Sequence, residues 1–463
     1  MRREAYQWGP SEPLRFGWQS SSRFASLVVE NVLFGYEVNG ATWFYLSLLL
    51  IVSVFFRFNR IWSWRNADLL VLLTLSPCVL IVRFAAKEAP WVYAWLFAAT
   101  ALLWGRMVID ASLTRRPRYE QNLNPAGMTF LLCSALAFQV ANIVSEEPHE
   151  SAVNTVRMAD DLLKGQEIDE TQSEAPSAGP AGRLLATPVV PLVGGAEFAA
   201  ARCLAVLSHV AVMLGLVCLG RWHFLDTNLG LAMATMYLLL PCTAYDTSRV
   251  MHVLPAALIL WAVVCYQRPM VAGCLLGLAC GTMFFALFLL PVWIAFYWRR
   301  GVFRFTGAVA SVTAILIASL MLTSGDTASF TRQIIGSIDW SALRFEGGEG
   351  LGFWSLYDAA YRIPVFATFC VALVMLTIWP LEKTLEHLLA HSAAVIIATQ
   401  FWYPNEGGIY ILWYLPLVLA VVFRPRLIHL TRATPPEAPP VHRSDWLGSA
   451  SPRMEPRSVP WQK

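Results

Sequence analysis

Long apolar segments, separated by short polar ones, dominate the hydropathy pattern of this chain. A helix that crosses a membrane needs about 20 consecutive, mostly apolar residues. Twelve segments have this character, so the pattern predicts an all-α polytopic integral membrane protein with about 12 transmembrane segments. The predicted spans are 41–56, 67–84, 91–109, 126–144, 197–220, 229–245, 250–266, 270–298, 305–322, 361–379, 388–401 and 409–423.

The segment 270–298 is too long for a single span. It contains Pro291, which interrupts a helix, and it ends at Arg299 and Arg300. We therefore predict two half-length helices that form a hairpin, so that the chain enters the membrane and returns to the same side.

Arginine-rich loops follow four of the predicted spans, and such loops are retained on the cytoplasmic side. All four lie on one side only if 270–298 is a hairpin. This predicts a multi-pass protein of the cytoplasmic (inner) membrane, with an exterior N-terminus and a cytoplasmic C-terminus. The clusters are Arg57, Arg60 and Arg65; Arg115, Arg116 and Arg118; Arg299, Arg300 and Arg304; and Arg424, Arg426 and Arg432.

The composition excludes two large classes of protein. Hydrophobic residues make up 57% of the 463 residues and charged residues only 14%, whereas a soluble domain has about 25% charged residues. The mean hydropathy is +0.52. A net charge of +3 is too small for a nucleic-acid-binding protein of this length. Membrane lipid is therefore the expected partner, and nucleic acid is not.

Four parts of the chain differ in character. Residues 1–40 have no basic bias and are predicted to lie outside the membrane or in its interface. Residues 41–125 hold three spans, and 126–430 hold the remaining membrane core. Residues 431–463 contain seven prolines in 33 residues, which predicts a disordered cytoplasmic tail.

The first of two long predicted exterior loops, 145–196, is rich in carboxylates. Glu147 and Glu150 follow a span directly, and Asp161 lies on a segment with helical spacing of apolar residues. Carboxylates just outside a membrane can act as general bases or bind a divalent cation. The alternative is that they only solvate the loop.

The second exterior loop, 323–360, combines Arg344, Trp354 and Tyr357, and a later short turn adds Glu406. Such a loop can close over a polar substrate. The spacing of His387 and His391 suits a metal, but no third ligand is evident, so we predict no metal site there.

Asp246, Arg249 and His252 recur at intervals of three residues at the start of a predicted span. On a helix they share one face. A polar face that runs into a membrane helix is costly and is a functional hypothesis by default. The alternative is an Asp–Arg ion pair beside an interfacial histidine.

From about residue 126 the order of motifs resembles the GT-C fold of membrane glycosyltransferases, and more narrowly the bacterial mannosyltransferases that use polyprenol-phosphate-mannose. In these proteins an acidic exterior loop follows the first span, and a later segment has small residues, then Thr-Lys, Leu-Leu-Pro and basic residues. The residues that carry the resemblance are Ala159, Leu162, Leu163 and Gly165, then Gly273, Gly277-Leu278-Ala279, Leu289-Leu290-Pro291 and Arg299-Arg300, and finally IYILWYLPLVLAVVFRP.

The resemblance implies a GT-C-like helical bundle that transfers a sugar from a polyprenol-phosphate donor to an exterior acceptor of unknown identity. It implies catalytic carboxylates, for which Glu150, Glu147 and Asp161 are the candidates. Arg249, Arg344 and Arg362 are the candidates for binding the donor phosphate. Candidates for substrate binding are Asp246, His252, Trp354, Tyr357 and Glu406.

Two positions depart from the family pattern: Met283 stands where a lysine is expected, and Ser151 where the catalytic aspartate is expected. The first removes a contact to the donor phosphate, and the second shifts the predicted base to Glu150. The resemblance implies no cofactor, although a divalent cation is compatible with the acidic loop. A transporter or flippase of a lipid-linked or polar solute, and a non-catalytic protein derived from the same fold, remain as alternatives.

Overall fold

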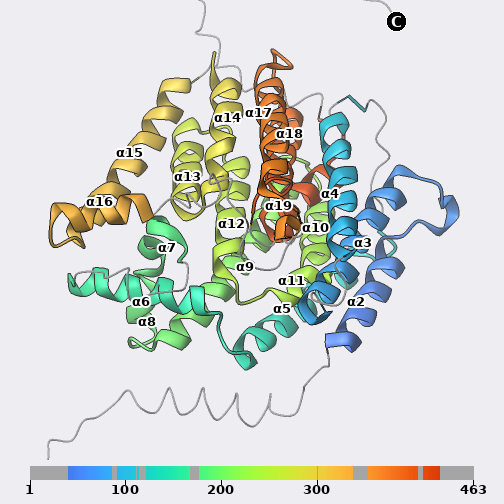
Figure 1. Cartoon of the computed structure of the whole chain (residues 1–463). Helices are drawn as coiled ribbons and strands as arrows, with labels where there is room; N and C mark the ends of the chain where they lie inside the picture. The colour runs from blue at the N-terminus through green and yellow to red at the C-terminus, as the bar shows by residue number, and fades with distance from the viewer. Residues whose placement is uncertain are drawn as a thin grey trace, which may run out of the picture.

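The computed structural model describes residues 40–85, 91–110, 112–113, 121–166, 177–299, 301–336, 353–355, 357–404 and 410–427. Every regular element in these ranges is a helix, so the predicted all-α class is confirmed. Figure 1 shows most long helices running roughly side by side as a bundle. The predicted N-terminal segment and the C-terminal tail fall outside the described residues, apart from Gly40.

The helices follow one another with short connections. Their bounds are α2 (Gly40–Phe55), η2 (Phe58–Arg60), α3 (Trp64–Ala85), α4 (Trp91–Asp110), α5 (Pro125–Ser145), α6 (Glu150–Lys164), α7 (Gly179–Ala186), α8 (Val189–Leu192), α9 (Glu197–Trp222), α10 (Thr227–Leu239), α11 (Pro241–Tyr245), α12 (Val250–Val264), α13 (Pro269–Thr282), η4 (Phe284–Leu289), α14 (Leu290–Tyr297), α15 (Val302–Leu322), α16 (Thr327–Gly336), η6 (Phe353–Ser355), η7 (Ala359–Tyr361), α17 (Arg362–Ile378), α18 (Leu385–Thr399) and α19 (Ile411–Phe423).

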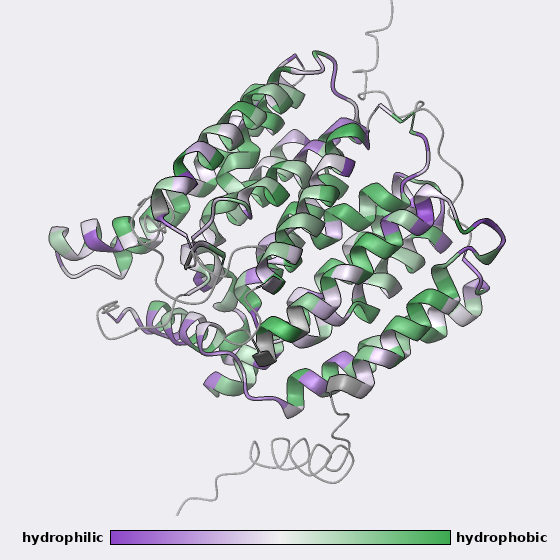
Figure 2. Ribbon diagram, turned by 45° about the vertical axis from the view of Figure 1, so that its right-hand side comes forward, coloured by the Kyte–Doolittle hydropathy of each residue, from purple (hydrophilic) through white to green (hydrophobic). Residues whose placement is uncertain are grey.

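Four of the described helices, α4, α5, α9 and α15, are long and apolar enough to cross a membrane. Eight further apolar stretches have 10–17 residues, shorter than a perpendicular span requires. Figure 2 shows hydrophobic residues along the lengths of the helices and hydrophilic ones gathered mainly at the turns. The structure thus supports an apolar helical protein, while a count of about 12 spans stays a prediction.

The chain alternates in direction, so its turns gather at two ends of the bundle. Asn122 donates to the carbonyls of Ser53 (2.8 Å) and Phe56 (3.0 Å), which joins the turn before α5 to the end of α2. Arg424 bonds Asp110, which joins the ends of α19 and α4. We call the end of the bundle where α2, α4 and α19 end the basic end. The opposite end is the loop end, and its turns are 146–149, 240–249, 283–289 and 400–404.

The reversal of the chain predicted within 270–298 is present, as α13, η4 and α14. A Cβ built on Gly273 would lie 2.5 Å from the carbonyl oxygen of Phe305, and one on Gly281 2.3 Å from Leu316. Contacts in this order require α13 and α15 to run in the same direction. The connecting α14 therefore runs back, and its Tyr297 hydroxyl donates to the carbonyl of Tyr266, just beyond α12 at the basic end (2.5 Å).

A buried ion network ties the N-terminal helices to the C-terminal ones at the basic end. Arg106 contacts Asp68 (2.8 Å) and Asp110 (2.5 Å), and Arg424 contacts Asp110 (2.6 Å) and Glu386 (2.8 Å). Asp110 and Arg424 are completely buried. Because these residues come from α3, α4, α18 and the end of α19, the helices of 41–125 share one core with the rest of the bundle.

Two short helices, α6 and α16, run across the direction of the bundle at the loop end (Figure 1). The side of α6 formed by Ala152, Val153, Val156 and Ala159 joins a small apolar cluster with α8 and α9. The helix predicted from the spacing of apolar residues around Asp161 is therefore present, as α6.

Candidate functional site

The N-terminus of α6 begins the candidate site. His149 caps the helix: its Nδ1 accepts the backbone N–H of Ser151 (3.2 Å) and lies 2.7 Å from the Ser151 hydroxyl. A side-chain acceptor at this position satisfies a backbone donor that has no partner within the helix. Gly165, in the left-handed conformation, ends the helix. The Ser151 side chain is buried and engaged by His149, whereas Glu150 beside it is exposed.

The hydroxyl of Thr155 fixes α7 against α6, because it accepts the backbone N–H of Ala178 just before α7 (3.0 Å). Gly179, at φ +59°, then lies so close to the tip of the hairpin that a Cβ would be 2.3 Å from the carbonyl oxygen of Gly281. Only glycine tolerates both the dihedral angle and the approach. The acidic loop is therefore held against the hairpin tip through α7, which Thr155 in turn fixes to α6.

Asp246 and Arg249 lie in the turn between α11 and α12, and His252 lies in the first turn of α12, so the three residues do not share one helix face as their spacing predicts. The carboxylate of Asp246 lies 3.4 Å from Nε of Arg249. His252 is buried, and its Nδ1 accepts the indole N–H of Trp413 (2.6 Å). His149 caps α6, Arg249 directly precedes α12, and these two helices contact each other, so we call His149, Asp246, Arg249 and His252 the polar group at this junction.

Aromatic rings continue from this polar group across the loop end. Trp413 stacks on Tyr410 and on Phe285 of the hairpin bend, each with ring centroids 4.3 Å apart. Phe284 stacks on Tyr403 (5.1 Å) and meets Trp402 edge-on (6.2 Å). Offset and edge-on contacts of this kind are the favourable arrangements of aromatic pairs. They hold the hairpin bend against the turn between α18 and α19.

Arg362 and Trp354 lie on the other side of this aromatic cluster, and both donate hydrogen bonds to the turn between α18 and α19. Nε of Arg362 donates to the carbonyl of Trp402 (3.1 Å), and the indole of Trp354 donates to the carbonyl of Phe401 (3.0 Å). The Arg362 side chain is fully buried. Both residues therefore anchor the backbone of the turn between α18 and α19.

The predicted carboxylates are more exposed and more dispersed. Glu147 and Glu150 are exposed and form no ion pair with another described residue. Asp161 lies about three turns further along α6, where partial burial, followed by the charge of Asp160, raises the pKa of its carboxyl. Tyr357 is exposed as well. Arg344 and Glu406 lie outside the described residues.

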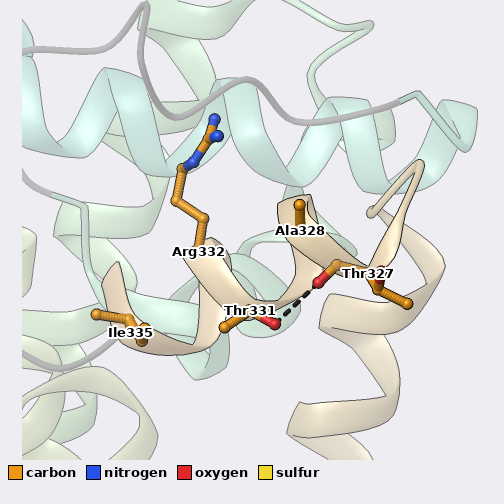
Figure 3. Close-up of a pocket in the computed structure, with 5 residues that line it drawn as sticks. All are labelled: Thr327, Ala328, Thr331, Arg332 and Ile335. Atoms are coloured by element: carbon orange, nitrogen blue, oxygen red, sulfur yellow. Dashed lines mark hydrogen bonds between the residues drawn. The ribbon is translucent and has the colours of Figure 1, made fainter.

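The hollow drawn in Figure 3 does not involve any of these residues. It has a volume of about 540 Å³ and is lined by Thr327, Ala328, Thr331, Arg332 and Ile335, all on α16. It is an open surface along one helix, without converging polar groups from other elements. The polar group around His252 is therefore the better candidate for chemistry. Within the described ranges, three or more His, Cys, Asp or Glu residues nowhere gather as a metal site would require.

Sequence reasoning missed three contributors to the site: His149, Arg183 and Trp413. His149 precedes Glu150 directly, and its role as a helix cap depends on a histidine where serine or aspartate is usual. Arg183 is buried on α7, with Nη2 3.5 Å from the Ser177 hydroxyl. A lone arginine within the apolar stretch 180–193 was a detectable signal. Trp413 had none, since it lies within the apolar stretch 409–423.

No family model matches the chain, and comparisons with curated proteins and with solved structures give no significant match.

Proposed function

We propose that this chain is a membrane glycosyltransferase that moves a sugar from a polyprenol-phosphate donor to an acceptor hydroxyl at the loop end. The supporting observation is the polar group at the junction of α6 and α12, where His149 caps one helix and Arg249 and His252 begin the other, next to the exposed Glu150. A cation and a carboxylate on adjoining elements are what transfer from a phosphate-linked donor requires.

In this proposal Glu150 is the general base. It removes the proton of the acceptor hydroxyl as the oxygen attacks the anomeric carbon of the sugar. The bond between that carbon and the phosphate oxygen breaks, and the polyprenol phosphate leaves with the electron pair. Arg249 stabilises the charge on the phosphate. Its guanidinium has five N–H groups, so a contact to phosphate is compatible with its ion pair to Asp246.

Arg249 becomes the principal candidate for the donor phosphate among the three arginines that the resemblance implies. Arg362 is fully buried, and its Nε donates to the carbonyl of Trp402 on the far side of the aromatic cluster from Arg249. Arg344 lies outside the described residues. The buried Arg183 of α7, which the acidic loop contributes, is a second cation at the same end.

Native mass spectrometry of the protein purified in mild detergent tests the proposal, with polyprenyl-phosphate-mannose as the probe. We expect the wild-type protein to retain this lipid and R249Q to lose it. R157Q is the matched control, because Arg157 is also an ion-paired arginine of the loop end, with Glu197 at 3.2 Å. Transfer of mannose from the same lipid to isolated membranes should fall by at least 100-fold in E150Q, the loss typical of removing a general base.

Two outcomes would contradict the proposal. If the wild-type protein binds no polyprenyl-phosphate-mannose even in excess, the donor site is absent and a non-catalytic protein of the same architecture is favoured. If the lipid binds but is only moved between leaflets of a vesicle, without transfer of the sugar, the chain is a flippase.

A further inference from the structure

The turn between α2 and α3 is a rigid loop at the basic end. The side chain of Asn66 donates to the carbonyls of Arg57 (3.1 Å), Arg60 (3.2 Å) and Ile61 (3.0 Å), and its oxygen accepts the backbone N–H of Arg57 (3.0 Å). Arg65 adds two bonds to the carbonyl of Phe55, at 2.9 and 3.2 Å. One side chain that satisfies four backbone groups fixes the conformation of the loop.

This rigid loop exposes large apolar side chains. Trp62 is 96% exposed, and Phe58, Ile61 and Trp64 are each 61–63% exposed. A flexible loop can fold such residues inward, but this one is held outward by its own hydrogen bonds. Exposed apolar groups gathered in one patch mark a surface that is covered by something else.

The charges on the same loop identify what covers it. Arg60 is exposed and Arg57 half-buried, and the described bonds of the loop use only their backbone atoms. Tryptophan prefers the boundary between hydrocarbon and headgroups, and arginine binds phosphate with two parallel N–H donors. A loop that combines the two suits the headgroup layer of an anionic membrane.

The same combination recurs at other turns of the basic end. Trp222 (53% exposed) follows Arg221 at the end of α9, and Trp298 (69% exposed) precedes Arg299 after α14. The exposed apolar surface also continues from the loop along α2 and α3, through Leu49 (66%) and Leu70 (51%). This continuity with a surface along the helix axes is expected of lipid contact.

We propose that the loop Arg57–Trp64 is a binding site for anionic phospholipid headgroups, with Arg57 and Arg60 on the phosphate and Trp62 and Trp64 at the hydrocarbon boundary. The inference rests on the membrane-span character of the long helices, and not on glycosyl transfer. A protein partner at the same patch is the competing occupant.

The test is native mass spectrometry of the full-length protein in detergent that contains equal amounts of phosphatidylglycerol and phosphatidylcholine. The wild-type protein should bind phosphatidylglycerol preferentially. R57Q/R60Q should lose about fivefold in phosphatidylglycerol affinity for each arginine removed, without a change for phosphatidylcholine. W62A/W64A should weaken the binding of both lipids.

The matched control is R157Q/R332Q, which removes the same charge from exposed arginines at the loop end and should leave lipid preference unchanged. If the double variant of the loop does not fold, R60Q alone tests the same point. An unchanged preference in R57Q/R60Q, or an equal loss in the control, would overturn the proposal.

Two other results are distinguishable. Equal binding of both lipids by a wild-type dimer that becomes monomeric in R57Q/R60Q would overturn the proposal in favour of an interface between copies. Release of the chain from membranes by alkaline carbonate would refute the membrane-span premise itself. Neither measurement involves a sugar donor, so the proposed transferase activity stands or fails separately.

Discussion

Replacing Asp110 by alanine tests whether the buried ion network holds the two parts of the bundle together. Asp110 is completely buried and accepts from Arg424 at 2.6 and 2.9 Å and from Arg106 at 2.5 Å. D110A therefore removes the shared counter-ion of two guanidiniums, of which that of Arg424 has no exposure to solvent.

Breaking a buried pair by removing one partner costs about 3–5 kcal/mol. Each arginine keeps a second carboxylate, Asp68 for Arg106 and Glu386 for Arg424, both at 2.8 Å. We therefore expect D110A to lower the free energy of unfolding by about 3 kcal/mol, the lower end of that range. D110L/R424M removes both charges and should cost no more than D110A alone.

Unfolding by guanidinium chloride in mild detergent, followed by circular dichroism, measures these differences. Arg157→Gln, which removes an exposed ion pair with Glu197, is the control and should shift the midpoint little, because solvent screens that pair. A loss below about 1 kcal/mol for D110A would refute the reasoning, since this is the value of exposed pairs. So would a double variant whose cost equals the sum of D110A and R424M, because the two charges would then be uncoupled.

Three further predictions follow from particular contacts. G273A should destabilise the protein by about 1–3 kcal/mol, because its Cβ would lie 2.5 Å from a backbone carbonyl of α15; thermal unfolding would contradict this if G307A, whose Cβ meets nothing within 4 Å, has the same effect. D161N should raise stability at neutral pH: folding raises the pKa of this carboxyl, so its ionised form opposes folding, and the penalty disappears as the pH falls through the folded-state pKa. The gain in the unfolding midpoint of D161N over wild type should be larger at pH 8 than at pH 3, which lies below the unfolded-state pKa of 3.8; an equal gain at both would refute electrostatics as the cause. N66A should cost about 1–3 kcal/mol, because it leaves several loop carbonyls without a partner; N59A, an exposed asparagine of the same loop, is its control, and equal midpoints for the two variants would contradict the role of Asn66.

The hairpin of α13, η4 and α14 shows what could be predicted from the sequence alone. Its length, the proline within it and the basic residues after it predicted the return of the chain, and the parallel course of α13 and α15 confirms it. The ion pair of Asp246 with Arg249 was one of the two alternatives that their spacing allowed, but it forms in the turn before α12 and not on a helix face. Local spacing identified the pair but not the conformation that makes it.

The role of Arg362 shows where such information ends. Its position at the start of a span was visible, but whether its guanidinium reaches a ligand or a backbone carbonyl depends on the turn 40 residues later that ends α18. Asp110 and Arg424 are 314 positions apart, so nothing local to either residue identifies the pair.

The sequence alone determined that this protein is an apolar helical chain, where most of its helices lie, and that 270–298 folds back on itself. These properties follow from hydrophobic periodicity and length, which act within a segment. Only the tertiary structure decided which charged side chains pair and which polar side chains hydrogen-bond to the backbone. It also decided that the loop after α2 exposes its tryptophans. Those outcomes depend on the direction in which each side chain leaves its helix and on the neighbour it finds there, and both are set by packing between segments that are distant in the chain.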